Sequence, residues 1–395
     1  MLRGGLACSA PDSCPALLYG RSVETLIAYT LRTLAVKLAI AGVGYWGPNI
    51  LRNAWELEHA DVVAICDQDE GALARQARRY GTTKFIIDFN DLLADDDIDA
   101  VCIVTPISTH YELAKAALLA GKHVFVEKPM ASSVKECDAL IEIASERGLV
   151  LMPGHTFLYS PPVIATKERL DSGEIGKLYF GTSSRVNLGI HQRDVSVVRD
   201  LAPHDFSILL YWLGQPSFLR GIARDTIVPG TFDVAFIDVG YEDGTLVHLE
   251  LSWLAPTKLR RTVLVGSEKM IVYEDTNPEQ VRVFDRGVEI VEPKSFGEFQ
   301  LSYRTGDVLT PRLAPNEPLR VELEDFVTAI RDGTEPRSNM NLGRDVVQMV
   351  EATELSLSYN CAPVPFELPD EDNRRLPDRR RSFGMPVIRP PRGPE

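Results

Sequence analysis

The sequence has a shortage of positive charge and of long apolar runs, and each shortage excludes a class of protein. Its 42 lysine and arginine residues stand against 56 aspartates and glutamates, which gives a net charge of −14. Such a surface repels phosphate backbones, so we expect no nucleic-acid partner. The most apolar N-terminal stretch, residues 26–41, is interrupted by Arg32 and Lys37. We therefore expect no signal peptide, no membrane span and no membrane partner.

Cysteine is also scarce, and its spacing does not suit metal chemistry. The six cysteines form no Cys-x-x-Cys pair and no cysteine–histidine pattern of the kind that binds zinc. Cys66 and Cys102 lie within apolar runs, where cysteine acts as a small buried hydrophobic residue. We therefore predict no metal site and a reducing, cytoplasmic location.

The length and the hydrophobic periodicity predict two domains of different architecture. Residues 1–35 are predicted to form a poorly ordered extension, and residues 366–395, rich in proline and arginine, a disordered tail. Residues 36–157 alternate short apolar strands with amphipathic helices, which is typical of an α/β domain with a parallel sheet. Residues 158–365 contain strand-like runs, an Asp-Gly hairpin signal at Asp243–Gly244 and a last helical hairpin. We expect an α+β domain there, with the hairpin packed back across both domains.

A glycine-rich turn joins the first predicted strand to the first predicted helix. Its glycines permit a tight turn and a close approach of the backbone to a pyrophosphate at the helix N-terminus. A carboxylate twenty residues later, at the end of the second strand, suits the ribose hydroxyls, and no arginine follows at 68–70, which favours NAD over NADP. The alternative is an ordinary strand–helix turn. The predicted cofactor residues here are Gly42, Gly44, Tyr45, Trp46, Gly47 and Asp67.

Two further strands end in polar residues at the same predicted sheet edge. Thr105 and Pro106 follow one strand, with His110 in the helix after it, and the strand "VFVEKPM" ends in Glu127 and Lys128. Ligands of open α/β sheets collect outside the carboxyl ends of the strands, so these residues are predicted to face the cofactor. An ammonium group there can stabilise a developing alkoxide. For His110 a capping or packing role is an equal alternative, and for Lys128 the alternative is a surface lysine.

The second domain contains Asp200 and His204 within "RDLAPHDFSILLYWLG". Because Pro203 lies between them, we expect Asp200 to precede the helix that His204 opens. An acidic residue beside an imidazole can fix its tautomer and raise its basicity, which suits a proton acceptor. A histidine at a helix start is otherwise a cap or a buried hydrogen-bonding residue.

Together the stretches "GVGYWG", "TPISTH", "EKP" and Asp200-x-x-x-His204-Asp205 resemble the Gfo/Idh/MocA family of NAD(P)-dependent sugar oxidoreductases. The resemblance covers roughly residues 36–360. It implies a Rossmann dinucleotide-binding domain followed by a domain with a large, mostly antiparallel open sheet that forms homodimers or homotetramers. It also implies a catalytic Lys128, with Asp200 and His204 from the second domain, Glu127 near the nicotinamide ribose and a Lys128–Pro129 bond that is often cis.

Within that family, "GVGYWGPNILRN", "GHTFLYSP" and "SSRVNLG" resemble a branch of nucleotide-sugar dehydrogenases. This likeness implies oxidation at C3 of a UDP-N-acetylglucosamine-type sugar or its uronate. The sequence departs from the branch in two ways, since Arg199 stands where tryptophan is frequent and the glycine-rich lead-in to the Asp/His pair is absent. The alternatives are a redox-neutral NAD-dependent glycosidase or lyase, and a non-catalytic NAD-binding sensor or corepressor.

Four polar residues are predicted to contact the substrate. Arg185 and Asn187 end the first strand of the second domain, and His155 follows the last strand of the first domain. Arg193 is expected to reach into the same space, where a guanidinium suits bidentate binding of a phosphate or a carboxylate. For each of the four, a salt-bridged or solvated side chain is the alternative.

Overall fold

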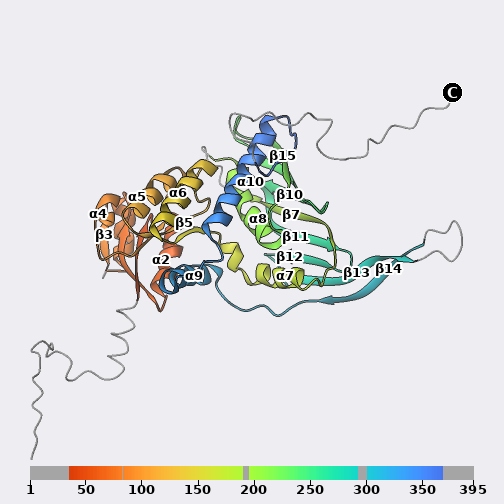
Figure 1. The fold of residues 1–395 in the computed structure, drawn as a ribbon, viewed down its shortest axis with the longest axis horizontal. Helices are drawn as coiled ribbons and strands as arrows, with labels where there is room; N and C mark the ends of the chain where they lie inside the picture. The colour runs from red at the N-terminus through yellow and green to blue at the C-terminus, as the bar shows by residue number, and fades with distance from the viewer. Residues whose placement is uncertain (1–34, 82, 190–194, 292–299, 368–395) are drawn as a thin grey trace, which may run out of the picture.

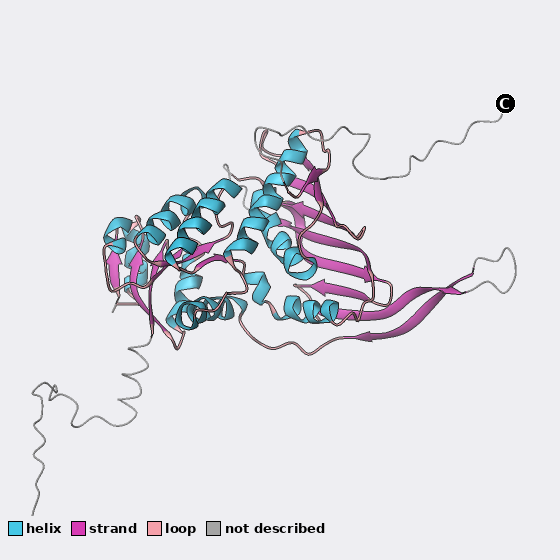
Figure 2. Cartoon of the chain, in the orientation of Figure 1, coloured by secondary structure: helices cyan, strands magenta, loops and turns pink. Residues whose placement is uncertain are grey.

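The structure, a computed structural model, describes residues 35–81, 83–189, 195–291 and 300–367. It contains two sheets side by side, each with helices against it (Figure 1), and Figure 2 shows the separation into a helix-rich half and a strand-rich half. Arg193, one of the predicted substrate residues, lies outside the described residues. Among the described helices none is both long and apolar enough to cross a membrane.

The first half contains the predicted parallel sheet. Its strand order is β3-β2-β1-β4-β5-β6, and every pairing is parallel. The inner strands are buried on both faces, which explains why they read as continuous apolar runs. The strands are β1 (Val36–Ala41), β2 (Ala60–Cys66), β3 (Lys84–Ile86), β4 (Ala100–Ile103), β5 (His123–Glu127) and β6 (Leu151–Gly154). The helices are α2 (Gly47–Trp55), α3 (Glu70–Ala77), α4 (Phe89–Leu93), α5 (Ile107–Leu119) and α6 (Val134–Arg147).

The second half contains a nine-stranded sheet in the order β14-β13-β12-β11-β7-β10-β9-β8-β15. Only the β7–β10 pair is parallel, so the prediction of a mostly antiparallel sheet is confirmed. The strands are β7 (Leu178–Leu188), β8 (Phe218–Arg224), β9 (Val234–Gly240), β10 (Leu246–Ser252), β11 (Leu254–Gly266), β12 (Met270–Glu274), β13 (Val281–Val291), β14 (Gln300–Leu309) and β15 (Val364–Pro365). The Asp-Gly hairpin joins β9 to β10, and Gly244 has a φ of +87°.

Five described helices follow the first sheet in the chain. They are the 3₁₀ helix η1 (Thr156–Tyr159), α7 (Pro161–Asp171), α8 (Val197–Leu213), α9 (Pro318–Asp332) and α10 (Met340–Ser358). α7, α8 and α10 pack on the second sheet, whereas η1 and α9 lie against each other. As predicted, the last two helices of the chain return across both halves: α9 packs on α2 and β1, and α10 packs on α6 and α8 (Figure 1). Lys128, directly after β5, contacts Asp200 in α8, so the carboxyl end of β5 lies near the start of α8. The domain boundaries at 157 and 365 stay predictions.

Candidate active site

The glycine-rich turn has the geometry that a dinucleotide requires. Gly42 has a φ of +95°, and a Cβ there would lie 2.7 Å from the carbonyl oxygen of Val104. A Cβ on Gly47 would overlap with the carbonyl oxygen of Gly42, so α2 packs closely against the turn. A Cβ on Gly44 would meet nothing within 4 Å, and no side chain caps α2. The open side of Gly44 and the uncapped helix N-terminus therefore fit a pyrophosphate.

Asp67 at the end of β2 is fixed by the same turn. Its carboxylate accepts hydrogen bonds of 2.8 Å from the N–H of Val43 and 2.9 Å from the N–H of Asp69. These bonds orient the carboxylate at the sheet edge and leave lone pairs for the hydroxyls of a ribose. Tyr45 and Trp46, in the turn itself, are 91% and 41% exposed, so both rings are available to a cofactor.

His110 lies between the two strand ends rather than in the open cleft. Its Nδ1 lies 2.9 Å from the carbonyl oxygen of Pro129 and its Nε2 lies 2.9 Å from that of Thr105. The side chain is 1% exposed, and burial lowers its pKa more than the two carbonyls raise it. Each ring nitrogen thus faces a carbonyl oxygen, and the neutral ring donates its one N–H to one of the two. The geometry favours the packing alternative, in which His110 holds the β4 and β5 ends together beside Thr105 and Pro106.

Lys128 follows β5 and reaches the second half of the molecule. Its Nζ donates a 2.9 Å hydrogen bond to the main-chain oxygen of Asp200 and lies 3.4 Å from the Oδ1 of that residue. The two side chains are 19% and 26% exposed, so the pair is shielded compared with a surface ion pair. Trp253 donates a 3.1 Å hydrogen bond from Nε1 to Oδ2 of Asp200. The Lys128–Pro129 bond is cis, as the resemblance implied.

The helix that carries Asp200 begins earlier than predicted. α8 begins at Val197, with the side chain of Ser196 as its cap, and continues through Pro203. The expectation that Asp200 precedes the helix was therefore wrong. A proline removes one N–H from a helix, but the cap and the buried face of α8, which includes Val197 and Pro203, outweigh that loss.

A continuous helix places Asp200 and His204 on the same face, one turn apart. Between these two described residues there is no hydrogen bond, and the carboxylate of Asp200 bonds to Lys128 and Trp253 instead. The expected fixing of the imidazole tautomer by Asp200 is thus absent from this geometry. Asp200 positions the ammonium group of Lys128.

His204 lies among cations and one aromatic ring. The ring of Phe157, in η1, meets the imidazole edge to face with 5.1 Å between centroids. The pKa of His204 lies well below its usual range, because the ring is desolvated and because Lys128, Arg185 and Arg260 are nearby. His204 is therefore neutral near pH 7. A neutral imidazole can accept a hydrogen bond from a substrate hydroxyl, although its basicity in this environment is low.

A group of buried polar side chains lies behind Lys128. Glu322 on α9 is fully buried, and its Oε2 accepts a 2.7 Å hydrogen bond from the hydroxyl of Thr156. Among the described residues, no partner exists for its Oε1, for Oε1 of Glu127 or for either ring nitrogen of His155. Burial raises the pKa of Glu127 to about 7, against smaller opposing effects of Lys128 and Trp46, and lowers that of His155 to about 3. Burial and the neighbouring Glu127 also raise the pKa of Glu322 well above its usual range.

Two of the remaining predicted substrate residues end β7. Arg185 donates a 2.5 Å hydrogen bond from Nε to Oδ2 of Asp205. The central carbon of its guanidinium group lies 4.6 Å from the ring centroid of Phe157. Asn187 donates a 3.3 Å hydrogen bond to the carbonyl oxygen of Leu188. The structure thus brings Arg185 into the surroundings of His204, whereas nothing places Asn187 there. The substrate roles of both residues stay predictions.

Arg199, which departs from the tryptophan of the nucleotide-sugar branch, links the two halves. It donates hydrogen bonds of 2.7 and 2.5 Å to the carboxylate of Glu354 on α10 and one of 2.9 Å to the carbonyl oxygen of Ser132. Arg199 is therefore a contact between the two halves. Residues that the sequence did not single out are Phe157, Trp253, Arg260 and Glu322. Phe157 lies within the stretch "GHTFLYSP" but was given no role, and the other three lie outside the quoted motifs, so only the folded chain shows that the four residues surround the site.

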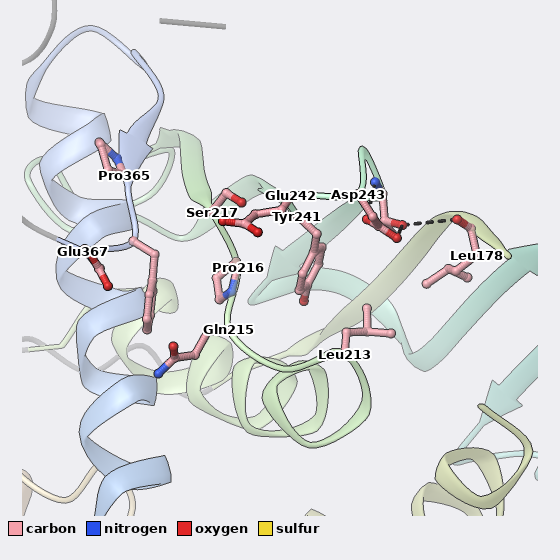
Figure 3. A pocket seen from close by; sticks show the side chains of 12 residues that line it. Leu178, Leu213, Gln215, Pro216, Ser217, Tyr241, Glu242, Asp243, Pro365 and Glu367 are labelled. Atoms are coloured by element: carbon pink, nitrogen blue, oxygen red, sulfur yellow. Dashed lines mark hydrogen bonds between the residues drawn. The ribbon is translucent and has the colours of Figure 1, made fainter. Parts of the chain in front are cut away.

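A cavity of about 730 Å³ lies away from these residues. Figure 3 shows Tyr241, Glu242 and Asp243 on one side and Pro365 and Glu367 on the other. α8 carries Asp200 near its start, and the cavity begins at its end, roughly 20 Å farther along at 1.5 Å per residue. This cavity therefore takes no part in the site.

Two family models match the chain in the positions of its two sheets. The oxidoreductase family with an NAD-binding Rossmann fold matches residues 36–155. The GFO/IDH/MocA C-terminal domain matches residues 163–272, so the two models together cover more than half of the chain. The chain belongs to the Gfo/Idh/MocA family and is an NAD-binding oxidoreductase.

Relatives of known activity lie within this family. The chain is 27% identical to scyllo-inositol 2-dehydrogenase (NAD(+)) of Bacillus subtilis, over 76% of this chain and 88% of the relative. It is 28% identical to UDP-N-acetylglucosamine 3-dehydrogenase of Acidithiobacillus ferrooxidans, over 75% of this chain and 88% of the relative. A solved oxidoreductase from Agrobacterium radiobacter, in complex with NAD+, L-tartaric acid and magnesium, has a TM-score of 0.71 at 20% identity and covers 84% of this chain and 98% of its own. That last likeness shows the fold alone.

Proposed function

We propose that the protein is a dehydrogenase that oxidises a ring hydroxyl of a sugar, with NAD as the hydride acceptor. The observation that carries this proposal is the contact of Lys128 with Asp200 across the two halves, one helical turn from His204. An ammonium group and a neutral imidazole there can hold the same hydroxyl oxygen from two sides. The match to an NAD-binding family and two dehydrogenase relatives supports the reaction class.

In this proposal the chain's own residues manage the proton and the charge. Gly42–Gly47 and Asp67 would hold NAD by its pyrophosphate and its adenosine ribose, and the bound cofactor would supply the acceptor for the hydride. Lys128 donates a hydrogen bond to the reacting oxygen and stabilises its developing negative charge. His204 accepts the hydroxyl proton, so that the products are a keto sugar, NADH and one proton. Lys128 and His204 act as a coupled pair, and either can be the formal base.

The finer proposal is that the substrate is a UDP-N-acetylhexosamine or its uronate, oxidised at C3. It rests on the resemblance of "GVGYWGPNILRN" and "GHTFLYSP" to the nucleotide-sugar branch. The relative that acts on UDP-N-acetylglucosamine supports this substrate. The inositol dehydrogenase, to which the chain is nearly as identical, supports only the oxidation of a ring hydroxyl. The preference for NAD over NADP rests on Asp67, whose negative charge repels a 2′-phosphate.

The test mixes the purified protein with NAD and with a panel of UDP-sugars, free sugars and inositols, and follows NADH absorbance and product mass. Lys128→Met is compared with Lys135→Met, because Lys135 lies on the exposed face of α6. We expect one compound to lose two hydrogens with the wild type and with Lys135→Met, and Lys128→Met to be at least about 100-fold slower. Glycoside cleavage without net NADH would favour the redox-neutral glycosidase. NAD binding without turnover of any compound would favour the sensor.

A further inference from the structure

Two arginines lie directly opposite each other in the sheet beneath His204. Arg260 on β11 pairs in register with Arg185 on β7, so both side chains leave the same face of the sheet. Their guanidinium carbons lie 5.6 and 4.6 Å from the ring centroid of Phe157. The same ring contacts the imidazole of His204. Both guanidinium groups are therefore adjacent to the proposed reaction centre.

Each arginine of this pair has one carboxylate partner, but part of the hydrogen-bonding capacity of both guanidinium groups is unused. Arg185 is 4% exposed and is bonded to Asp205 through Nε and Nη2, but its Nη1 is buried without a hydrogen-bond partner. Arg260 donates one 3.1 Å hydrogen bond from Nη1 to Asp275 and keeps a side chain that is 32% exposed. Like charges directly opposite in a sheet are destabilising. The partly exposed guanidinium of Arg260 keeps N–H donors that a ligand can reach.

These cations also act on His204. Lys128, Arg185 and Arg260 surround the imidazole from β5, β7 and β11, and the carboxylates that face the same space are Asp200, Asp205 and Asp275. Burial lowers the pKa of His204 most, and these three cations are the next largest causes. An anion placed on Arg260 would offset part of that field. Its arrival would raise the basicity of the imidazole at the moment that a proton must be accepted.

We infer that Arg260, with Arg185 behind it, binds an anionic group of the sugar substrate, a carboxylate or a phosphate, close to the carbon that is oxidised. This inference rests on the proposed dehydrogenase function. A guanidinium forms two parallel, charge-assisted hydrogen bonds with either group, and these are stronger than the hydrogen bonds it forms with a neutral hydroxyl. The substrate class is therefore an anionic sugar, a uronate or a sugar phosphate ester such as a UDP-sugar, rather than a neutral inositol or hexose.

The experiment compares Arg260→Gln with Arg261→Gln. Arg261 is the next residue of β11, is exposed and points to the opposite face of the sheet, so it is a matched control. Each protein is assayed with NAD and, in turn, with UDP-N-acetylglucosamine, its uronate, free glucuronate, free N-acetylglucosamine and inositol. The melting temperature of each variant is measured to check that it is folded. We expect kcat/KM for the anionic compounds to fall roughly 10- to 100-fold in Arg260→Gln and to stay unchanged in Arg261→Gln.

The compounds separate the two sources of negative charge. Turnover of free glucuronate assigns the anion to a ring carboxylate, and turnover of UDP-N-acetylglucosamine without glucuronate assigns it to the diphosphate. The acidic limb of the kcat profile should also shift to higher pH with an anionic substrate than with a weak neutral one. A neutral sugar as the best substrate, with no effect of Arg260→Gln, would overturn the inference and leave the dehydrogenase intact. NADH formation from none of the compounds would overturn both.

Discussion

The carboxyl group of Glu127 offers a prediction whose size follows from the structure. Burial raises its pKa from 4.5 to about 7. The folded protein therefore holds a proton on Glu127 over a range in which the unfolded chain has lost it. Stability from this group is complete below pH 4.5 and falls by ~1.4 kcal/mol per pH unit until about pH 7, a total of about 3 kcal/mol. Above pH 7 the contribution is flat.

Glu127→Gln removes this titration and keeps the shape of the side chain. The variant should be less affected by a rise from pH 4.5 to pH 7 than the wild type, and the difference between the two melting temperatures should change by about 6 to 10 °C across that range. The measurement is differential scanning fluorimetry in buffers of constant ionic strength. Calorimetry at the two ends checks the enthalpy, since a chain of two domains need not unfold in one step.

The matched control is Glu324→Gln on α9, where the carboxylate is 48% exposed and pairs with Arg320 one turn away. A surface pair of this kind contributes about 0.3 to 0.5 kcal/mol, so its pH dependence should follow that of the wild type. Equal pH dependence in Glu127→Gln and the wild type would refute the reasoning. It would mean that the carboxyl of Glu127 is ionised in the folded protein despite its burial.

Three further predictions concern the cofactor and the assembly. Gly44→Ala should keep the melting temperature and lose NAD binding in calorimetric titration, whereas Gly42→Ala should also lower the melting temperature, because its Cβ would lie 2.7 Å from a carbonyl oxygen. Retained NAD binding in Gly44→Ala would contradict this use of the turn. Asp67→Ala should weaken NAD binding roughly 10- to 100-fold and NADP binding less, and an equal loss for both would contradict the ribose contact. We propose that the protein forms the homodimer or homotetramer that the family resemblance implies, through the exposed face of β9, where Phe236 is 38% exposed. Phe236→Glu should then reduce the mass in analytical ultracentrifugation from that of an oligomer to that of one chain, and an oligomer of unchanged mass would exclude this sheet face as the interface.

Local sequence patterns predicted the parts of the site that lie at strand ends. The turn at Gly42–Gly47 and the position of Lys128 follow from strand–helix alternation, because parallel strands bring their carboxyl ends to one edge. The residues that surround His204 could not be predicted from local sequence patterns. Arg260 reaches Arg185 through a strand pairing between residues far apart in sequence, and no turn signal sets that register.

The start of α8 was missed for a related reason. The sequence prediction began the helix after Pro203, at His204, because local propensity disfavours proline within a helix, whereas the buried face of α8 and the Ser196 cap stabilise the helix on both sides of Pro203. The same holds for Glu322, which has no motif around it and becomes notable only when α9 folds back beside Glu127. Tertiary packing, rather than propensity, decides both.

The most direct test of the account follows the hydride itself. A substrate identified from the panel is prepared with deuterium on the carbon that is oxidised, and the wild type and Lys128→Met are incubated with NAD. The account predicts NADH that is one mass unit heavier with the wild type, formation of this product at least about 100-fold slower with Lys128→Met, and equal NAD binding by both proteins in calorimetry. Unlabelled NADH from the wild type, or equal deuterium transfer by Lys128→Met, would contradict it.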